Sequence, residues 1–135
     1  MLQIRNTQML QMLETNDALL RTAITKRVRE QYAELVNGLP NDLLDEMIEN
    51  GIQSARGYGL TQAENITEFV LIMFEVGPEF HRHPRIRPIL SDPTIAAEEK
   101  LKVMFDRTPD QVWDEIVSVL YRQTWFPERR QPNED

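Results

Sequence analysis

Cysteine is absent from this chain of 135 residues, and its absence excludes several kinds of chemistry at once. Disulfide bonds, thiol catalysis and thiolate metal sites all require cysteine, and a chain without it suits a reducing compartment. Serine is also scarce: Ser54, Ser91 and Ser118 are the only three, and none lies in a nucleophile-elbow motif. No glycine-rich phosphate-binding loop occurs either. These absences favour a protein that is not an enzyme.

The sequence also lacks an excess of basic charge and any long apolar run. A net charge of −7 weighs against nucleic acid and anionic membrane surfaces as partners, because both attract basic proteins. The longest apolar stretch, residues 69–74, is too short to span a bilayer. The first residues show no basic segment followed by an apolar run, as a signal peptide would. We therefore expect a cytoplasmic protein with no membrane or nucleic-acid partner.

Helical periodicity is the main pattern that is present. Apolar residues recur at spacings of three and four, and no segment alternates as a strand would. Four prolines between residues 78 and 93 exclude a long helix there. The sequence predicts an all-α fold: a single compact, bundle-like domain of about five helices over residues 1–126, followed by a disordered tail over 127–135. The helices are expected near residues 7–37, 41–56, 61–76, 92–105 and 108–121.

Local signals predict where these helices begin, break and pack. Asn16 is a good N-cap and marks an expected break in the first helix, and Asn41 is the expected cap of the second. Residues 61–64 and 108–111 fit the capping box, in which a threonine and a glutamate or glutamine satisfy backbone donors. Gly51 lies inside a predicted helix, where close packing against another helix would explain it. The helix that contains residues 69–74 should be the most buried.

The only two histidines, His81 and His83, lie close together in the sequence. Two imidazoles one residue apart can share a metal ion, but a metal site needs further ligands. Neither a cysteine nor a Glu-x-x-His pair is available to supply them. We therefore expect no metal and no other cofactor.

The loop around the histidines also carries Arg82, Arg85 and Arg87, a basic spot on an acidic protein. These arginines could bind a partner that bears carboxylates or phosphates. The alternative, which charge patterning favours, is that they pair within the fold with the acidic residues between positions 42 and 49.

Two apolar surfaces are further candidates for contact with a partner. Met9, Met12 and Leu13 make the first predicted helix apolar over more than one stripe, and methionine-rich surfaces suit adaptable binding. Trp125 and Phe126 follow the last predicted helix. Each group either packs into the core or is exposed for contact with a partner, and for the aromatic pair the core is the favoured alternative.

Several segments resemble small uncharacterised helical proteins that are encoded beside effector, spike-tip and adaptor genes in type VI secretion clusters of Gram-negative bacteria. The similarity spans the first two-thirds of the chain, although such proteins often have aspartates at positions 81 and 83. The resemblance implies an accessory role around a secreted toxin, with no catalytic residues to transfer. The segments are Leu2-x-Ile4-Arg5-x-x-Gln8-Met9, Gly51-Ile52-x-x-Ala55-x-x-Tyr58-Gly59, Phe69-x-x-x-Met73-Phe74-x-x-Gly77-Pro78-x-Phe80 and Ile89-Leu90-x-Asp92-Pro93.

Three functions fit these observations. The first is a chaperone or adaptor that binds a secreted effector or its spike-tip carrier, and a broad apolar groove would favour it. The second is an immunity protein that occludes a toxin, and a charged convex face would favour it. The third is a small enzyme or ligand-binding bundle, which would need a closed polar pocket. In the first two the partner is another protein, and assembly into a homo-oligomer is left open.

Overall fold

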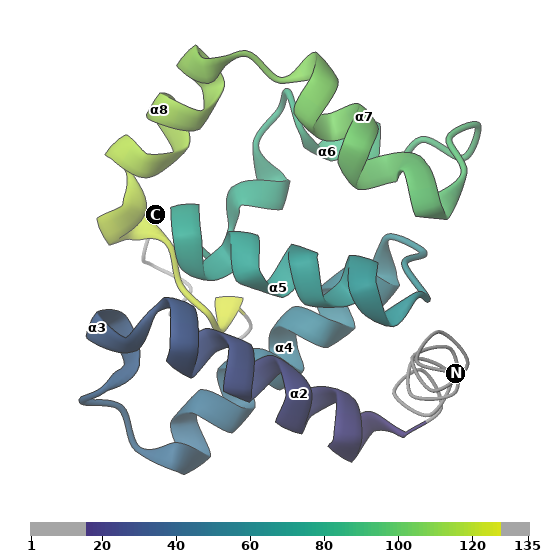
Figure 1. The fold of residues 1–135 in the computed structure, drawn as a ribbon. Helices are drawn as coiled ribbons and strands as arrows, with labels where there is room; N and C mark the ends of the chain where they lie inside the picture. The colour runs from purple at the N-terminus through teal and green to yellow at the C-terminus, as the bar shows by residue number, and fades with distance from the viewer. Residues whose placement is uncertain (1–15, 128–135) are drawn as a thin grey trace.

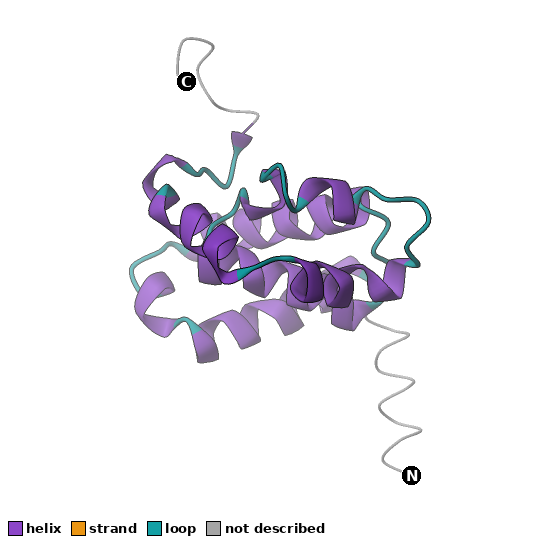
Figure 2. Ribbon diagram, turned by 90° about the horizontal axis from the view of Figure 1, so that it is seen from above, coloured by secondary structure: helices purple, strands orange, loops and turns teal. Residues whose placement is uncertain are grey.

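The computed structural model describes residues 16–127, of which 72% are helical and none lies in a strand (Figure 2). Seven α-helices occur in this part of the chain, five of them with seven residues or more, so the predicted all-α bundle of about five helices is confirmed. Three short 3-10 turns lie between or after them. The helices are α2 (Asp17–Gln31), α3 (Ala33–Val36), α4 (Asn41–Gly57), α5 (Ala63–Val76), α6 (Arg87–Leu90), α7 (Lys100–Arg107) and α8 (Asp110–Ser118).

Helix α5 is the central element of the bundle. Helices α2, α3 and α4 lie on one side of it, and α7 and α8 lie on the other (Figure 1). Contacts between elements join α5 to α2, α4 and α8, whereas α7 packs mainly on α6. The segment from Phe69 to Phe74 is buried throughout, which confirms the prediction that this helix is the most buried. None of the helices within residues 16–127 has the length and apolar character that crossing a membrane requires.

Gly51 allows α4 and α5 to approach closely. A Cβ atom added at Gly51 would lie 2.9 Å from Val70 Cγ2 and 3.2 Å from Met73 Sδ, both on α5. The first distance is shorter than normal van der Waals contact allows. The close packing predicted from a glycine inside a helix is therefore confirmed.

We expect Gly51→Ala to be less stable than Gly57→Ala by about 1–3 kcal/mol in urea unfolding, the usual cost of overpacking. Both substitutions replace a glycine of α4 by alanine, but an added Cβ at Gly57, the last residue of the helix, meets nothing within 4 Å. A lower stability of Gly51→Ala, in spite of the helix preference that alanine gains in the interior of a helix, therefore reports the α4–α5 contact. Equal unfolding free energies would mean that the two helices do not pack closely at this point.

The helix boundaries confirm one predicted cap and add one break. Asn16 precedes α2, and its side-chain oxygen accepts a hydrogen bond from the backbone N–H of Leu19 at 3.2 Å. The predicted cap is therefore confirmed, and the residues that would precede the expected interruption lie outside the described part of the chain. A break occurs at Tyr32, whose backbone (φ −127°, ψ 36°) leaves the helical region between α2 and α3. That break was not predicted.

Other predicted boundaries were wrong. The N-cap positions of α5 and α8 are Gln62 and Pro109, and neither makes a side-chain capping bond, so neither capping box caps its helix. Thr108 is buried, and its hydroxyl therefore faces the interior of the protein instead of the end of the helix. Asn41 is the first residue of α4, with Pro40 at the cap.

The last two helices are also shorter than predicted. Asp92 accepts hydrogen bonds from Thr94 in a local turn, and α7 begins only at Lys100. Helix α8 ends at Ser118, three residues before the predicted end at residue 121, and Tyr121 is 78% exposed.

Candidate partner-binding groove

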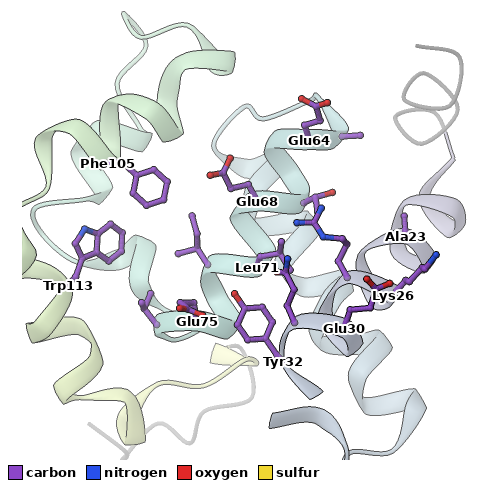
Figure 3. A pocket seen from close by; sticks show the side chains of 16 residues that line it. Ala23, Lys26, Glu30, Tyr32, Glu64, Glu68, Leu71, Glu75, Phe105 and Trp113 are labelled. Carbon is purple, nitrogen blue, oxygen red and sulfur yellow. The ribbon is translucent and has the colours of Figure 1, made fainter. Parts of the chain in front are cut away.

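An open groove of about 1010 Å³ lies over one face of α5, between α2 on one side and Phe105 and Trp113 on the other (Figure 3). Residues four apart on a helix lie on the same face, and α5 contributes such a stripe to the floor. The half of the stripe near the start of α5 is polar and acidic, and the half near its end is mostly apolar. The floor residues are Ala63, Glu64, Thr67, Glu68, Leu71, Ile72, Glu75 and Val76.

Aromatic side chains form the walls at the apolar end. Phe105 of α7 stacks on Trp113 of α8 with ring centroids 5.8 Å apart, and Trp113 in turn lies 6.3 Å from Phe80. Phe105 is nevertheless 44% exposed, so a large part of its ring surface faces the groove or solvent. Tyr32 stands on the opposite wall, stacked on Phe74 at 6.1 Å. The groove therefore offers a ligand flat apolar surfaces on both sides.

Tyr32 is held in this wall as a neutral hydrogen-bond donor. Burial raises the pKa of Tyr32 to about 12, and the hydrogen bond to the Glu75 carboxylate and the charge of that carboxylate act in the same direction. Because the phenol stays protonated at neutral pH, it donates to Glu75. This contact ties the break between α2 and α3 to the floor of the groove.

The basic loop predicted to bind a partner makes its own contacts outside the groove. Arg82 pairs with Glu79 at 3.5 Å, and the expected pairing with the acidic start of α4 was wrong for this arginine. On α4, Glu49 instead pairs with Arg21 of α2, at 3.4 Å. Arg85 and Arg87 are exposed, and neither lines the groove.

The aromatic pair after α8 folds back onto the core. Trp125 and Phe126 are half-buried, and the Trp125 ring lies 4.4 Å from that of Phe74. The Asn50 side chain donates to the backbone carbonyl of Trp125 at 2.9 Å. Trp125 and Arg82, two of the predicted partner residues, both line a second pocket of about 260 Å³. Met9, Met12 and Leu13 lie outside the described residues.

The two histidines have separate roles in the fold. His81 is 7% exposed and packs against the rings of Tyr58, Phe69 and Phe80. Its Nδ1 lies 2.8 Å from the Tyr58 hydroxyl. Burial lowers the pKa of His81 to about 4, and the charge of the neighbouring Arg82 adds to this effect. The imidazole is therefore neutral at pH 7, and its Nδ1 shares a hydrogen bond with the Tyr58 hydroxyl.

His83 makes contacts with Glu115 and with the backbone of Arg85. Its Nε2 lies 3.1 Å from Glu115 Oε2, and its Nδ1 accepts the backbone N–H of Arg85. The two imidazoles therefore do not share a ligand position. Across residues 16–127, no group of three or more histidine, cysteine, aspartate or glutamate side chains is placed to hold a metal ion.

The groove was missed at the level of sequence because its apolar residues follow the same periodicity as the core. Phe105 and Trp113 lie on predicted core stripes, and so do the apolar residues of α5. One signal could have indicated the groove: residues 69–74 are apolar on every face. Such a helix needs cover on every side, and α7 and α8 are short.

The described residues thus define an all-α helical domain with an open groove on its central helix. No family model matches the chain, and no curated protein or solved structure matches it. The role of the groove is accordingly argued from its own side chains.

Proposed function

We propose that this chain is a non-enzymatic accessory protein, a chaperone or adaptor, that binds a type VI secretion effector or its carrier in the groove over α5. The resemblance of residues 2–9, 51–59, 69–80 and 89–93 to proteins of those gene clusters supplies the cellular context. The observation that carries the binding role is the groove itself, with a phenylalanine 44% exposed on its wall.

The dimensions and composition of the groove suit a segment of a protein. Helix α5 has 14 residues, which at 1.5 Å per residue gives a floor about 21 Å long, enough for about four turns of a partner helix. Stacked aromatic rings beside aliphatic side chains, with charged residues at the edges, are typical of the energetic centre of a protein interface. A broad apolar groove also favours the chaperone or adaptor over the other functions considered.

Phe105→Ala should weaken binding strongly while leaving the fold intact. We expect a loss of about 2 kcal/mol or more, which is about 30-fold in affinity, because a few large side chains dominate such interfaces. The measurement is co-purification of the tagged full chain with the products of its neighbouring genes, followed by titration of the partner found. Melting temperature should change little, because Phe105 is partly exposed.

Tyr121→Ala is the matched control, since Tyr121 is a more exposed aromatic residue that does not line the groove. It should bind the same partner as tightly as the unmodified chain does. Equal losses in the two variants would contradict a role for the groove. A partner unrelated to secretion would refute the type VI context and leave the groove as the binding surface.

A further inference from the structure

Two carboxylates lie at the edge of the groove without forming an ion pair in the described part of the protein. Glu64 and Glu68 are exposed and lie one turn apart on α5 (Figure 3). Side chains at this spacing are neighbours, and like charges there oppose each other. No ion pair to either carboxylate occurs within residues 16–127.

The opposite edge of the groove differs in charge. Helix α2 contributes Lys26, Arg27 and Glu30, so this edge carries one more positive than negative charge. On α5 every charged residue that lines the groove is a glutamate. Of these, Glu75 already accepts a hydrogen bond from the Tyr32 hydroxyl. The excess negative charge of the groove therefore lies on the α5 edge, at Glu64 and Glu68.

The apolar surface continues from these carboxylates along the same stripe. Leu71 and Ile72 follow Glu68 by three and four residues, and Val76 lies a turn further on. Phe105 and Trp113 flank this part of the stripe. A ligand that fills the groove must therefore present apolar groups along its length and positive charge beside the start of α5.

The ligand should also satisfy its own backbone hydrogen bonds. The walls and floor of the groove are helices, whose backbone groups already bond within each helix. No strand edge is present among the described residues to pair with an extended segment. A helix needs no such pairing, because its backbone donors and acceptors are satisfied internally.

We propose, on the basis of the proposed function, that the groove binds an amphipathic α-helix of the partner protein, with lysine or arginine residues one turn apart beside its apolar stripe. The apolar stripe packs on Leu71, Ile72 and the aromatic walls. The basic pair lies against Glu64 and Glu68. The basic residues determine which helix is accepted.

Two synthetic peptides test this selectivity. Both are helical, about 18 residues long and built on the same leucine stripe, and they differ only in having lysine or glutamate beside the stripe. Binding to the full chain is measured by fluorescence anisotropy at about 0.05 M salt. We expect the lysine peptide to bind about tenfold more tightly, a preference that should disappear near 1 M salt.

Two pairs of charge substitutions show which carboxylates cause the preference for the lysine peptide. Glu64→Gln combined with Glu68→Gln should remove it, because the peptide then loses its anionic partners in the groove. Glu98→Gln combined with Glu99→Gln is the matched control, since it changes the net charge equally at two exposed residues outside the groove. The control should keep the tenfold preference. Loss of the preference in both variants would mean that peptide binding depends only on the net charge of the protein. That result would overturn the proposal.

The remaining outcomes separate this proposal from the proposed function. Equal binding of both peptides, weakened by Phe105→Ala, would overturn the basic helix and leave the groove as a binding surface. Binding that is indifferent to Phe105→Ala would overturn both.

Two further results would identify another occupant of the groove. Self-association that is lost in Phe105→Ala would identify a second copy of the chain as the occupant. Tighter peptide binding after Met12→Asp and Leu13→Asp would identify the chain's own first residues. Either result would overturn the proposal.

Discussion

Phe69→Ala should lower the free energy of unfolding by about 3–5 kcal/mol, the largest effect expected of any single truncation considered. Phe69 is fully buried on the central helix. Its ring lies 5.2 Å from that of Phe80, 5.3 Å from that of His81 and 6.0 Å from that of Tyr58. Removing it leaves a cavity among rigid rings that cannot collapse to fill it. Urea unfolding followed by circular dichroism measures the change.

Phe105→Ala removes the same atoms from a position that is 44% exposed, and it is the control for this measurement. We expect it to cost about 1 kcal/mol or less. A cost below about 1 kcal/mol for Phe69→Ala would show that α5 is not the core of the bundle. A cost for Phe105→Ala as large as that for Phe69→Ala would show that the wall of the groove is part of the core.

The second large effect is a loss of stability in mild acid caused by His81. The pKa of His81 is about 4 in the folded protein, against 6.5 for an ordinary histidine. Between these values the unfolded chain binds a proton that the folded protein excludes. The free energy of unfolding therefore falls as the pH drops from about 6.5 to about 4, and the loss amounts to about 3 kcal/mol. Above pH 7 His81 is neutral in both states and contributes no pH dependence.

The slope of stability against pH, measured by urea unfolding, identifies the group. His81→Gln should flatten the curve between pH 6.5 and pH 4, even if this variant is less stable at every pH. His83→Gln should retain the slope, because it leaves His81 and the rings packed around it unchanged. Arg82, Arg87 and Glu79 also act on the pKa of His81, and all three remain in both variants. An unchanged slope in His81→Gln would assign the acid sensitivity to other groups.

The helical fold was predictable because the apolar spacing repeats within each helix. Residues of α4 and α5 at intervals of three and four do form the core, and the cap at Asn16 and the close contact at Gly51 appear where local chemistry requires them. These features depend on neighbours in sequence or on a single packed face. They can therefore be read without knowing how the helices are arranged.

The groove and several helix ends could not be predicted, because they depend on that arrangement. Phe105 and Val112 occupy similar positions in apolar stripes, yet Val112 is buried and Phe105 is 44% exposed, since α7 packs mainly on α6. The capping box at residues 108–111 failed because Thr108 is drawn into the interior. The break at Tyr32 coincides with the stacking of its ring on Phe74, far along the chain.

The most direct test of the groove as a binding surface is to locate the bound lysine peptide by methyl NMR on the full chain. We expect shift changes at Leu71, Ile72 and Val76, which line the groove. Val117 and Val119, partly exposed residues that do not line the groove, should not change. Changes at Val117 and Val119 with none on α5 would contradict the groove as the site where this protein binds its partner.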